Sequence, residues 1–298
     1  MVNSFRNVVG SRTEAVVVLA GDQGFSDGNF SQVAAGTDQR SAEISITKFG
    51  GAGDVGDPEP LGNLPFGWQP RLQGSMGYLT AKNDYHGGLL QGDESKYNTF
   101  AIQFGGGARL WFNDHLSIAP TIMGMYGHTE NEYTARSAFA QANFAQAQNL
   151  GLINWKADTW TVIPAGDVQY LFTWRRTVFT LTSDFTYYHT ESFNTSTPNL
   201  SINGSSESWK NMIDVDIPLG KELFGHELHT GGFFSRTDFY DDLQTGLNTD
   251  HLYEAHGRLV LDFLGKLWKV KWIGLGGSYM WGDNFSAWTV GADVAFKF

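Results

Sequence analysis

The sequence predicts an all-β protein, namely a transmembrane antiparallel up-and-down β-barrel of about twelve strands with short periplasmic turns and longer extracellular loops. The first observation is strict alternation of apolar and polar residues over 288–298, which ends with Phe298. A period of two places successive side chains on opposite faces of a strand. The second is that the polar faces of other strands carry charges at mid-strand, whereas a soluble sandwich or lipocalin-like barrel has its polar face outside. Apolar side chains on the outer face and polar side chains on the inner face are the arrangement expected of a barrel in a membrane.

Composition agrees with this fold class and excludes several functions. The 298 residues include 36 Gly and no Cys, with 14% aromatic and 17% charged residues, which suits strands joined by tight turns. The lack of Cys removes disulfides and thiolate metal sites, and a net charge of −11 argues against nucleic-acid partners. No apolar run is long enough for a membrane-spanning helix. Residues 1–4 lack a charged and then apolar leader, so we expect the signal peptide to have been removed.

Alternation between turn residues gives the positions of the strands. The clearest strands are expected near 98–112, 115–128, 158–173, 177–191, 207–217, 251–263, 269–281 and 288–298. Weaker ones are expected near 40–48, 70–82 and 227–239, and a further one over roughly 13–22. In the first of the clear strands Phe100, Ile102 and Phe104 share the face assigned to lipid. Trp and Tyr near the strand ends, such as Trp160 and Tyr279, indicate aromatic belts at the membrane interfaces.

The lengths of the connections give an independent check. Short turns near 113–114, 174–176 and 265–266 alternate with longer links near 83–97, 129–157, 193–206 and 240–250. Outer-membrane barrels have this asymmetry, with short turns on the periplasmic side. The Gly- and Pro-rich link 50–69 is the exception, because it would be a long periplasmic connection.

We expect one domain, the barrel of residues 13–298, preceded by an N-terminal segment, residues 1–12, that is periplasmic or enters the lumen. Residues 134–149 are rich in Ala and Gln, which favours a helix in the longest extracellular loop. That helix would either fold into the mouth as a constriction, with Phe139 and Phe144 against the wall, or cover the rim.

The inward faces form the candidate functional site. Twelve strands leave a lumen of about 10 Å. The residues assigned to it are Arg71, Arg109, Asp167, Asp184, Lys210, Asp214, Glu254, His256, Arg258 and Asp293. Since unpaired charges in a dry interior are costly, either the lumen is hydrated or these groups pair into networks that plug it. In a hydrated lumen, a ring formed by Arg109, Arg258, Asp214 and Glu254 would set selectivity.

Catalytic and metal sites are not expected, nor is any cofactor. A lipase would need Ser and His side by side on the lipid-facing rim, and Ser183 and His189 share a face but lie too far apart along one strand. His226 and His229 would point to opposite faces of a strand, so they do not form a metal pair. We therefore expect no enzymatic activity.

The strand count, the length and the ending Gly291 to Phe298 resemble those of autotransporter translocator domains, and more specifically of solitary autotransporter-type outer-membrane barrels. The resemblance implies a pore-like barrel in the bacterial outer membrane. Because the sequence contains no passenger domain, we expect that the self-secretion role of such barrels would have no substrate here.

From these observations we predict a monomeric channel that lets ions or small polar solutes pass through a charged lumen. Its surroundings would be the lipid bilayer and lipopolysaccharide, and the outer-membrane assembly machinery would bind the C-terminal strand, with Phe296 and Phe298 as the assembly signal. One alternative is a plugged barrel that acts as a surface adhesin or receptor, or as a passenger-less autotransporter translocator domain. A second alternative is an outer-membrane enzyme.

Overall fold

The computed structural model describes the backbone of residues 13–21, 28–32, 40–61, 66–197, 200–267, 270–283 and 285–296. The first strands are β1 (Gly28–Gln32), β2 (Arg40–Asp54), β3 (Glu59–Pro60), β4 (Gly67–Tyr85), β5 (Glu94–Trp111) and β6 (Leu116–Thr134). The later ones are β7 (Lys156–Trp174), β8 (Thr177–Thr195), β9 (Asn203–Leu223), β10 (His226–Tyr240), β11 (His251–Leu267), β12 (Val270–Gly282) and β13 (Phe285–Phe296). Labelled helices are η1 (Gly88–Leu90), α2 (Ala138–Asn149) and α3 (Asp241–Leu247), and residues 13–21 form a further helix.

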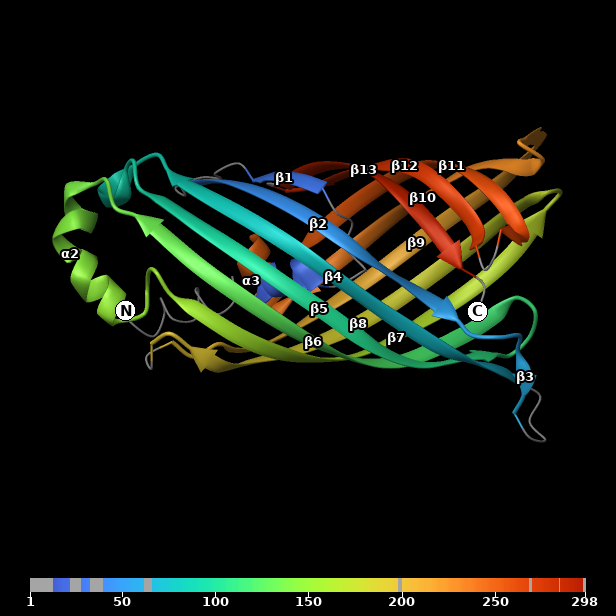
Figure 1. Ribbon diagram of the computed structural model, residues 1–298, viewed down its shortest axis with the longest axis horizontal. Coiled ribbons are helices and arrows are strands. Elements are labelled where there is room, and N and C mark those ends of the chain that lie inside the picture. Colours follow the sequence, from blue (N-terminus) through green and yellow to red (C-terminus); the bar gives the residue numbers. More distant parts are fainter. Residues whose placement is uncertain are drawn as a thin grey trace.

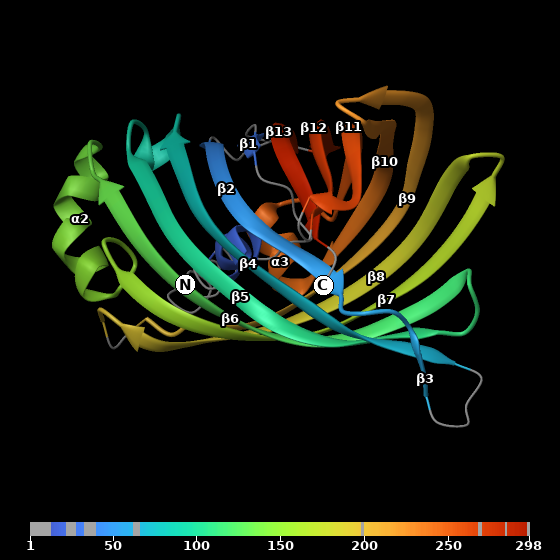
Figure 2. The same ribbon diagram turned by 45° about the vertical axis from the view of Figure 1, so that its right-hand side comes forward.

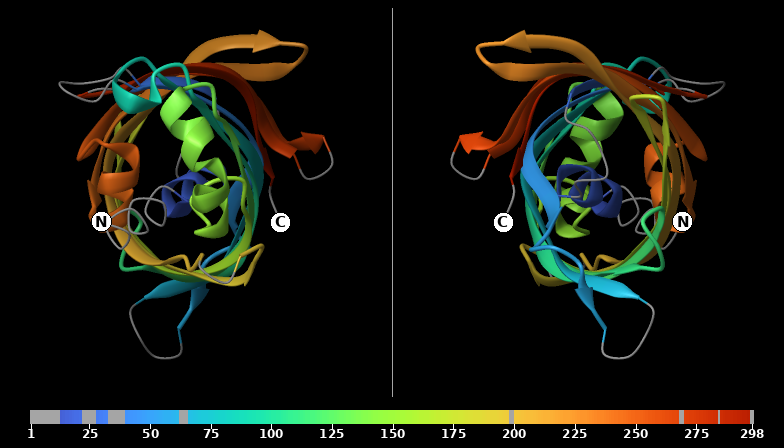
Figure 3. Two further views of the ribbon diagram at one scale, coloured as in Figure 1. Left: turned by 90° about the vertical axis from the view of Figure 1, so that its left-hand side faces the viewer. Right: turned by 90° about the vertical axis from the view of Figure 1, so that its right-hand side faces the viewer.

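The strands form one closed antiparallel sheet. Each strand from β4 to β13 pairs with the next, β2 pairs with β4, and β1 pairs with both β2 and β13. Apart from the two-residue β3, which pairs only with β4, the described strands therefore make a ring of twelve (Figure 3). The predicted fold class is confirmed. A closed ring is the form of sheet that suits a membrane, because it leaves no edge strand in the hydrocarbon.

The two ends of the barrel differ as the connections predict. The turns β5–β6, β7–β8 and β9–β10 are short and lie at one end, together with the β2–β4 connection that contains β3. The connections that contain η1, α2 and α3 lie at the other, extracellular end. Figures 1 and 2 show α2 and β3 at opposite ends of the molecule. The exception is the β12–β13 connection, which is short although it lies at the extracellular end.

Side-chain exposure confirms which face of each strand is outermost. Phe104 on β5 is 69% exposed, whereas its neighbour Gln103 is buried. On β13, Trp288 and Val290 are exposed by 58% and 75%, and Thr289 between them is buried. The apolar residues thus face outward around the ring and most of the polar ones face inward. The side chains of Asp293 and Phe296, and the whole of Phe298, lie outside the described residues.

The expected strand over 13–22 is wrong, because residues 13–21 form a helix whose side chains are all buried. The ring instead begins with β1 at Gly28–Gln32. The run Ala15–Leu19 is apolar at every position rather than every second one, which fits a segment surrounded on all sides. No described helix has the length and apolar character needed to cross a membrane.

β5 and β6 approach closely where three glycines follow one another, at residues 105–107. A Cβ at Gly107 would collide with the carbonyl oxygen of Pro120 on β6. The missing side chains allow the strands to coil tightly here, directly beside the inward-facing Arg109.

Opposite faces of β8 provide a test of the inside-out arrangement. Leu181 is an exposed apolar residue, and the adjacent Thr182 lines an internal cavity with Asp167 and Asp184. We expect Leu181→Arg to lower folding stability in lipid by about 2–4 kcal/mol, since it places a charge against hydrocarbon. Thr182→Arg should cost far less. Heat-modifiable gel mobility after refolding into vesicles measures the folded fraction, and equal losses in the two variants would contradict the facing assignment.

Candidate functional site

The lumen holds a short helix. Residues 13–21 run inside the ring of strands, where they appear as the dark blue coil in Figure 3. Their apolar side chains join those of the surrounding wall in one buried cluster. The wall residues of this cluster include Leu79, Tyr97, Met125, Trp155, Ile163, Tyr188, Phe239 and Leu243. The upper, extracellular half of the lumen is therefore a closely packed core, mostly apolar but with buried threonine pairs such as Thr99 and Thr129, and a hydrated pore would not have such a core.

The direction of this helix follows from contacts at its two ends. Near its N-terminal end, Glu14 accepts a hydrogen bond from Ser206, which lies close to the extracellular start of β9 (2.8 Å). At its C-terminal end, the carbonyl of Gly21 accepts a hydrogen bond from Ser75 in the middle of β4. The helix thus runs inward from the extracellular mouth towards the middle of the barrel.

Glu14 is a buried carboxylic acid that lies beside a second carboxylate, that of Asp242. Its carboxylate and that of Asp242 on α3 both lie against Gly204, where a Cβ would collide with Glu14. Burial raises the pKa of Glu14 to about 8, the bond from Ser206 opposes this shift, and the charge of Asp242 adds to it. The carboxyl group is therefore mostly protonated at neutral pH while the helix is docked.

The lower half of the lumen is polar and its charges are compensated. Buried Arg109 binds Asp54 through Nε (3.0 Å) and Asp167 through Nη1 (3.0 Å), and donates to Ser117 (2.7 Å). Arg71 binds the other oxygen of Asp54 (2.9 Å) and lies 3.8 Å from Asp167. Two arginines and two aspartates thus form one neutral group on β2, β4, β5 and β7.

Two further ion pairs lie on the opposite wall. Arg258 holds Asp214 through two bonds of 2.6 and 2.8 Å. Lys210 lies 3.8 Å from Glu254. His256 contacts Ser278 through Nδ1 at 2.8 Å.

A cavity of about 190 Å³ separates the two walls. Its lining includes Arg71, Asp167, Asp184, Lys210 and Tyr188. Of the residues predicted for the lumen, Arg71, Asp167, Asp184 and Lys210 line this cavity, while for Asp293 only the backbone position opposite Gly274 is described. The four residues expected to form a selectivity ring belong instead to three separate ion-paired groups.

The extracellular loop helix α2 lies across the mouth of the barrel (Figures 1 and 3). Asp93 anchors its start by accepting hydrogen bonds from the backbone N–H groups of Arg136 and Ser137 (2.7 and 2.6 Å). Ala140 is the only residue of α2 that is buried, and Phe139 is 48% exposed. The helix therefore covers the rim more than it fills the bore.

A Ser–His contact exists on the outer face, although not the one considered from the sequence. The Nδ1 of His189 contacts Ser205 at 3.0 Å, and its Nε2 contacts Glu191 at 3.2 Å. Ser205 also accepts from Tyr187 (3.0 Å), and its own backbone N–H donates to Asp242 (3.2 Å). That N–H is therefore not available to stabilise an oxyanion. The contact was missed because Ser205 reaches His189 through the β8–β9 register.

The acidity of Glu14 gives a pH prediction. Its docked pKa of about 8 exceeds the ordinary value of 4.5, so docking takes up a proton. The cost of keeping Glu14 buried is absent below about pH 4.5 and grows as the pH rises through 8. We expect channel openings in planar bilayers to become more frequent between pH 6 and 9, and Glu14→Gln to abolish this rise. A rise of equal size in the variant would assign the effect to other groups.

The central arginine gives a stability prediction. Arg109→Leu removes the buried cation of the group and leaves Arg71 alone to balance Asp54 and Asp167, so unfolding in lipid should become easier by up to about 3–5 kcal/mol. Lys82→Leu is the matched control, because Lys82 pairs with Asp84 and Glu94 at the exposed extracellular rim, where solvent screening leaves ion pairs with little effect on stability. Reversible urea titrations of vesicle-inserted protein compare the two. Similar losses would mean that the Arg109 group is as weak as a surface pair.

Comparisons with known proteins bear on this architecture. A family model described as "Solitary outer membrane autotransporter beta-barrel domain" matches residues 63–291. No curated protein matches the chain.

Three solved structures share the fold. The β domain of the Bordetella autotransporter BrkA has a TM-score of 0.55 at 11% identity, with 92% of this chain and all of that one covered. The transport unit of AIDA-I from Escherichia coli gives 0.56 at 8% identity, covering 98% and 97%. The translocator domain of NalP from Neisseria meningitidis gives 0.57 at 10%, covering 91% and 86%.

The family match spans most of the barrel, and the three similar structures share its fold. The chain therefore belongs to the family of solitary outer-membrane autotransporter β-barrel domains, and its place is the bacterial outer membrane.

Proposed function

We propose that this autotransporter-type barrel carries polypeptide that lies N-terminal to residue 13 outward through its lumen and then keeps residues 13–21 as the plug. One observation supports this above all, namely that the lumen helix has its N-terminal end, at Glu14, towards the extracellular mouth. A polypeptide joined to this end of the helix would then be delivered to the outer side of the membrane. The family to which the barrel belongs supports the same reading.

The size of the lumen is compatible with one chain in transit. A helix is about 10 Å across with its side chains, which matches the roughly 10 Å left inside a twelve-stranded ring. After transit, the apolar run Ala15–Ala20 matches the apolar upper wall, so burial holds it there. Ion pairing of Arg71, Arg109, Lys210 and Arg258 with wall carboxylates weakens their attraction for a passing segment.

A passive channel for ions or small solutes is the second candidate, and the polar lower wall favours it. In the docked state the apolar core of the upper half opposes it, because the helix closes the path. A channel role therefore requires the helix to leave the lumen. The enzyme alternative has no support from the geometry at Ser205, and an adhesin or receptor role would rest on the exposed surface of α2.

The expected partners of this protein are inferred from the barrel fold and not from a particular binding site. We propose that the barrel is a monomer, that its apolar belt contacts lipid and lipopolysaccharide, and that the C-terminal strand up to Phe298 is bound by the outer-membrane assembly machinery. The β12–β13 ladder, with Val270 opposite Phe296, makes this strand part of the wall once assembly is complete.

Topology in cells tests the translocation proposal. An epitope fused before residue 1 should be cleaved by protease added to intact bacteria, because the N-terminal end of the lumen helix faces outward. The same epitope placed between Arg175 and Arg176, in a short periplasmic turn, should stay protected until the outer membrane is opened. Protection of the N-terminal epitope in cells whose barrel is folded would overturn the proposal.

A cysteine pair tests the plug separately from translocation. A Cβ at position 127 on β6 would lie 2.7 Å from Cγ1 of Val17, within reach of a disulfide, and the natural sequence has no Cys to compete. The double variant Val17→Cys with Gly127→Cys should be silent in planar bilayers when oxidised and regain wild-type openings on reduction. Steady conductance in the oxidised state would mean that ions bypass the helix.

A further inference from the structure

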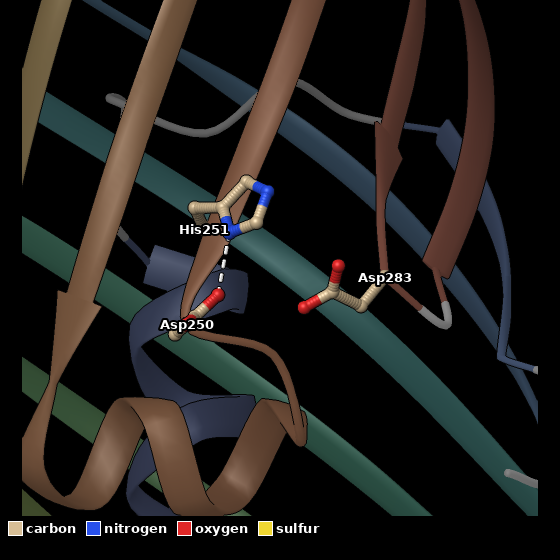
Figure 4. A group of neighbouring side chains, drawn as sticks. All are labelled: Asp250, His251 and Asp283. Carbon is tan, nitrogen blue, oxygen red and sulfur yellow. Dashed lines mark hydrogen bonds and ion pairs between the residues drawn. The ribbon is translucent and has the colours of Figure 1, made fainter.

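Three metal-binding side chains meet at the extracellular rim, away from the lumen. Asp250 and His251 lie where the α3 connection enters β11, and Asp283 follows β12. One ligand atom from each residue lies within 4.8 Å of the other two. In Figure 4 the Asp250 carboxylate lies below the imidazole ring, joined to it by the dashed line, and the Asp283 carboxylate lies below the ring and to the right. The three residues come from two separate connections that the fold brings side by side.

The position of the imidazole is fixed by its neighbours. Its Nδ1 lies 2.5 Å from Oδ1 of Asp250, and its ring packs edge-on against that of Tyr253 at 5.2 Å. The His251 side chain is 22% exposed, whereas Asp250 and Asp283 are open to solvent. An ion therefore has a route in, and water can complete its coordination.

The local charge favours a cation. Arg236 is close enough to Asp250 for the two charges to attract, but its guanidinium is hydrogen-bonded to Asp238 through Nε (2.9 Å) and Nη2 (2.6 Å), and Asp238 is the cross-strand partner of His251. Among the residues that the structure describes, neither Asp250 nor Asp283 forms an ion pair with a Lys or Arg. The imidazole of His251 therefore has two carboxylate groups beside it that can act as ligands.

We propose that Asp250, His251 and Asp283 bind a divalent transition-metal ion of the Zn²⁺ type. One imidazole nitrogen with two carboxylate oxygens suits zinc, while calcium and magnesium prefer oxygen ligands alone. Ligand atoms around tetrahedral zinc are about 3.4 Å apart, given bonds of roughly 2.0–2.1 Å. Shifts of about 1 Å in exposed side chains would bring the present atoms to that spacing.

The ion would join two connections at the rim. It would tie the end of the α3 connection to the short β12–β13 connection. At its other end α3 carries Asp242, which lies beside Glu14, and Leu243 of α3 is buried in the lumen cluster. Metal binding would therefore hold in place the connection that covers the lumen helix. This site does not depend on the translocation proposal.

Calorimetry on the full chain, folded in detergent and freed of metal with a chelator, tests the site with ZnCl₂. We expect one equivalent of Zn²⁺ at micromolar affinity, with CaCl₂ and MgCl₂ binding far more weakly. His251→Gln and Asp283→Asn should each weaken zinc binding at least about tenfold. Heat-modifiable mobility confirms that each variant is folded, and Asp283→Asn, at an exposed position, is the less disruptive of the two.

His115→Gln is the matched control, since His115 is an exposed histidine at the periplasmic β5–β6 turn and should not affect the zinc site. Two results would overturn the proposal. One is that the wild-type chain takes up no stoichiometric zinc. The other is that the His251 and Asp283 variants bind it as tightly as the His115 variant, which would make the binding adventitious.

Discussion

The structure depends on closure of the backbone hydrogen-bond ladder, because lipid offers no partner for a free N–H or carbonyl group. Most neighbouring strands pair over long stretches, and the closing strand β1 spans Gly28–Gln32 in the part of the chain that the structure describes. Its ladder with β13 runs from Asn29 opposite Trp288 to Gln32 opposite Phe285. Among the described strands, the one that closes the ring is therefore also the strand that follows the lumen helix in sequence.

Closing the sheet also creates a lumen, which must be filled by protein side chains or by water. In this barrel the lumen helix fills the extracellular half, and the periplasmic half is lined by polar and charged residues. Near the extracellular mouth the wall is apolar and the helix fills it, with Trp155 and Val17 fully buried. Towards the periplasm the wall carries charges, and each cation considered above has an anionic neighbour, as Arg258 has Asp214. Burial of apolar surface stabilises the extracellular half, and ion pairing offsets the desolvation free energy of the charged residues in the periplasmic half.

The features that depend on contact with lipid could be predicted from the sequence. Those that depend on packing inside the lumen could not. Hydrocarbon forces a period of two on every strand, so the outward set Phe100, Ile102 and Phe104 was readable from alternation alone. Helix 13–21 was not, because its β-branched run Val16–Val18 favours a strand by intrinsic propensity and only the surrounding wall makes it helical. Asp54 was missed because the strand was expected to end near residue 48, whereas β2 continues to Asp54 and brings that carboxylate to Arg109.

A lumen that lets a chain pass and a lumen that is closed by a helix require different linings. The position of Glu14 shows how this lumen can do both. A plug must be apolar to exclude water, and the run Ala15–Ala20 meets that demand. An entirely apolar helix would stay wherever it was first buried, with nothing to define its depth. A carboxyl group that is buried more favourably when protonated, and that Ser206 bonds, gives the helix one favourable register near the mouth. The acid that weakens the plug is therefore also the group that positions it.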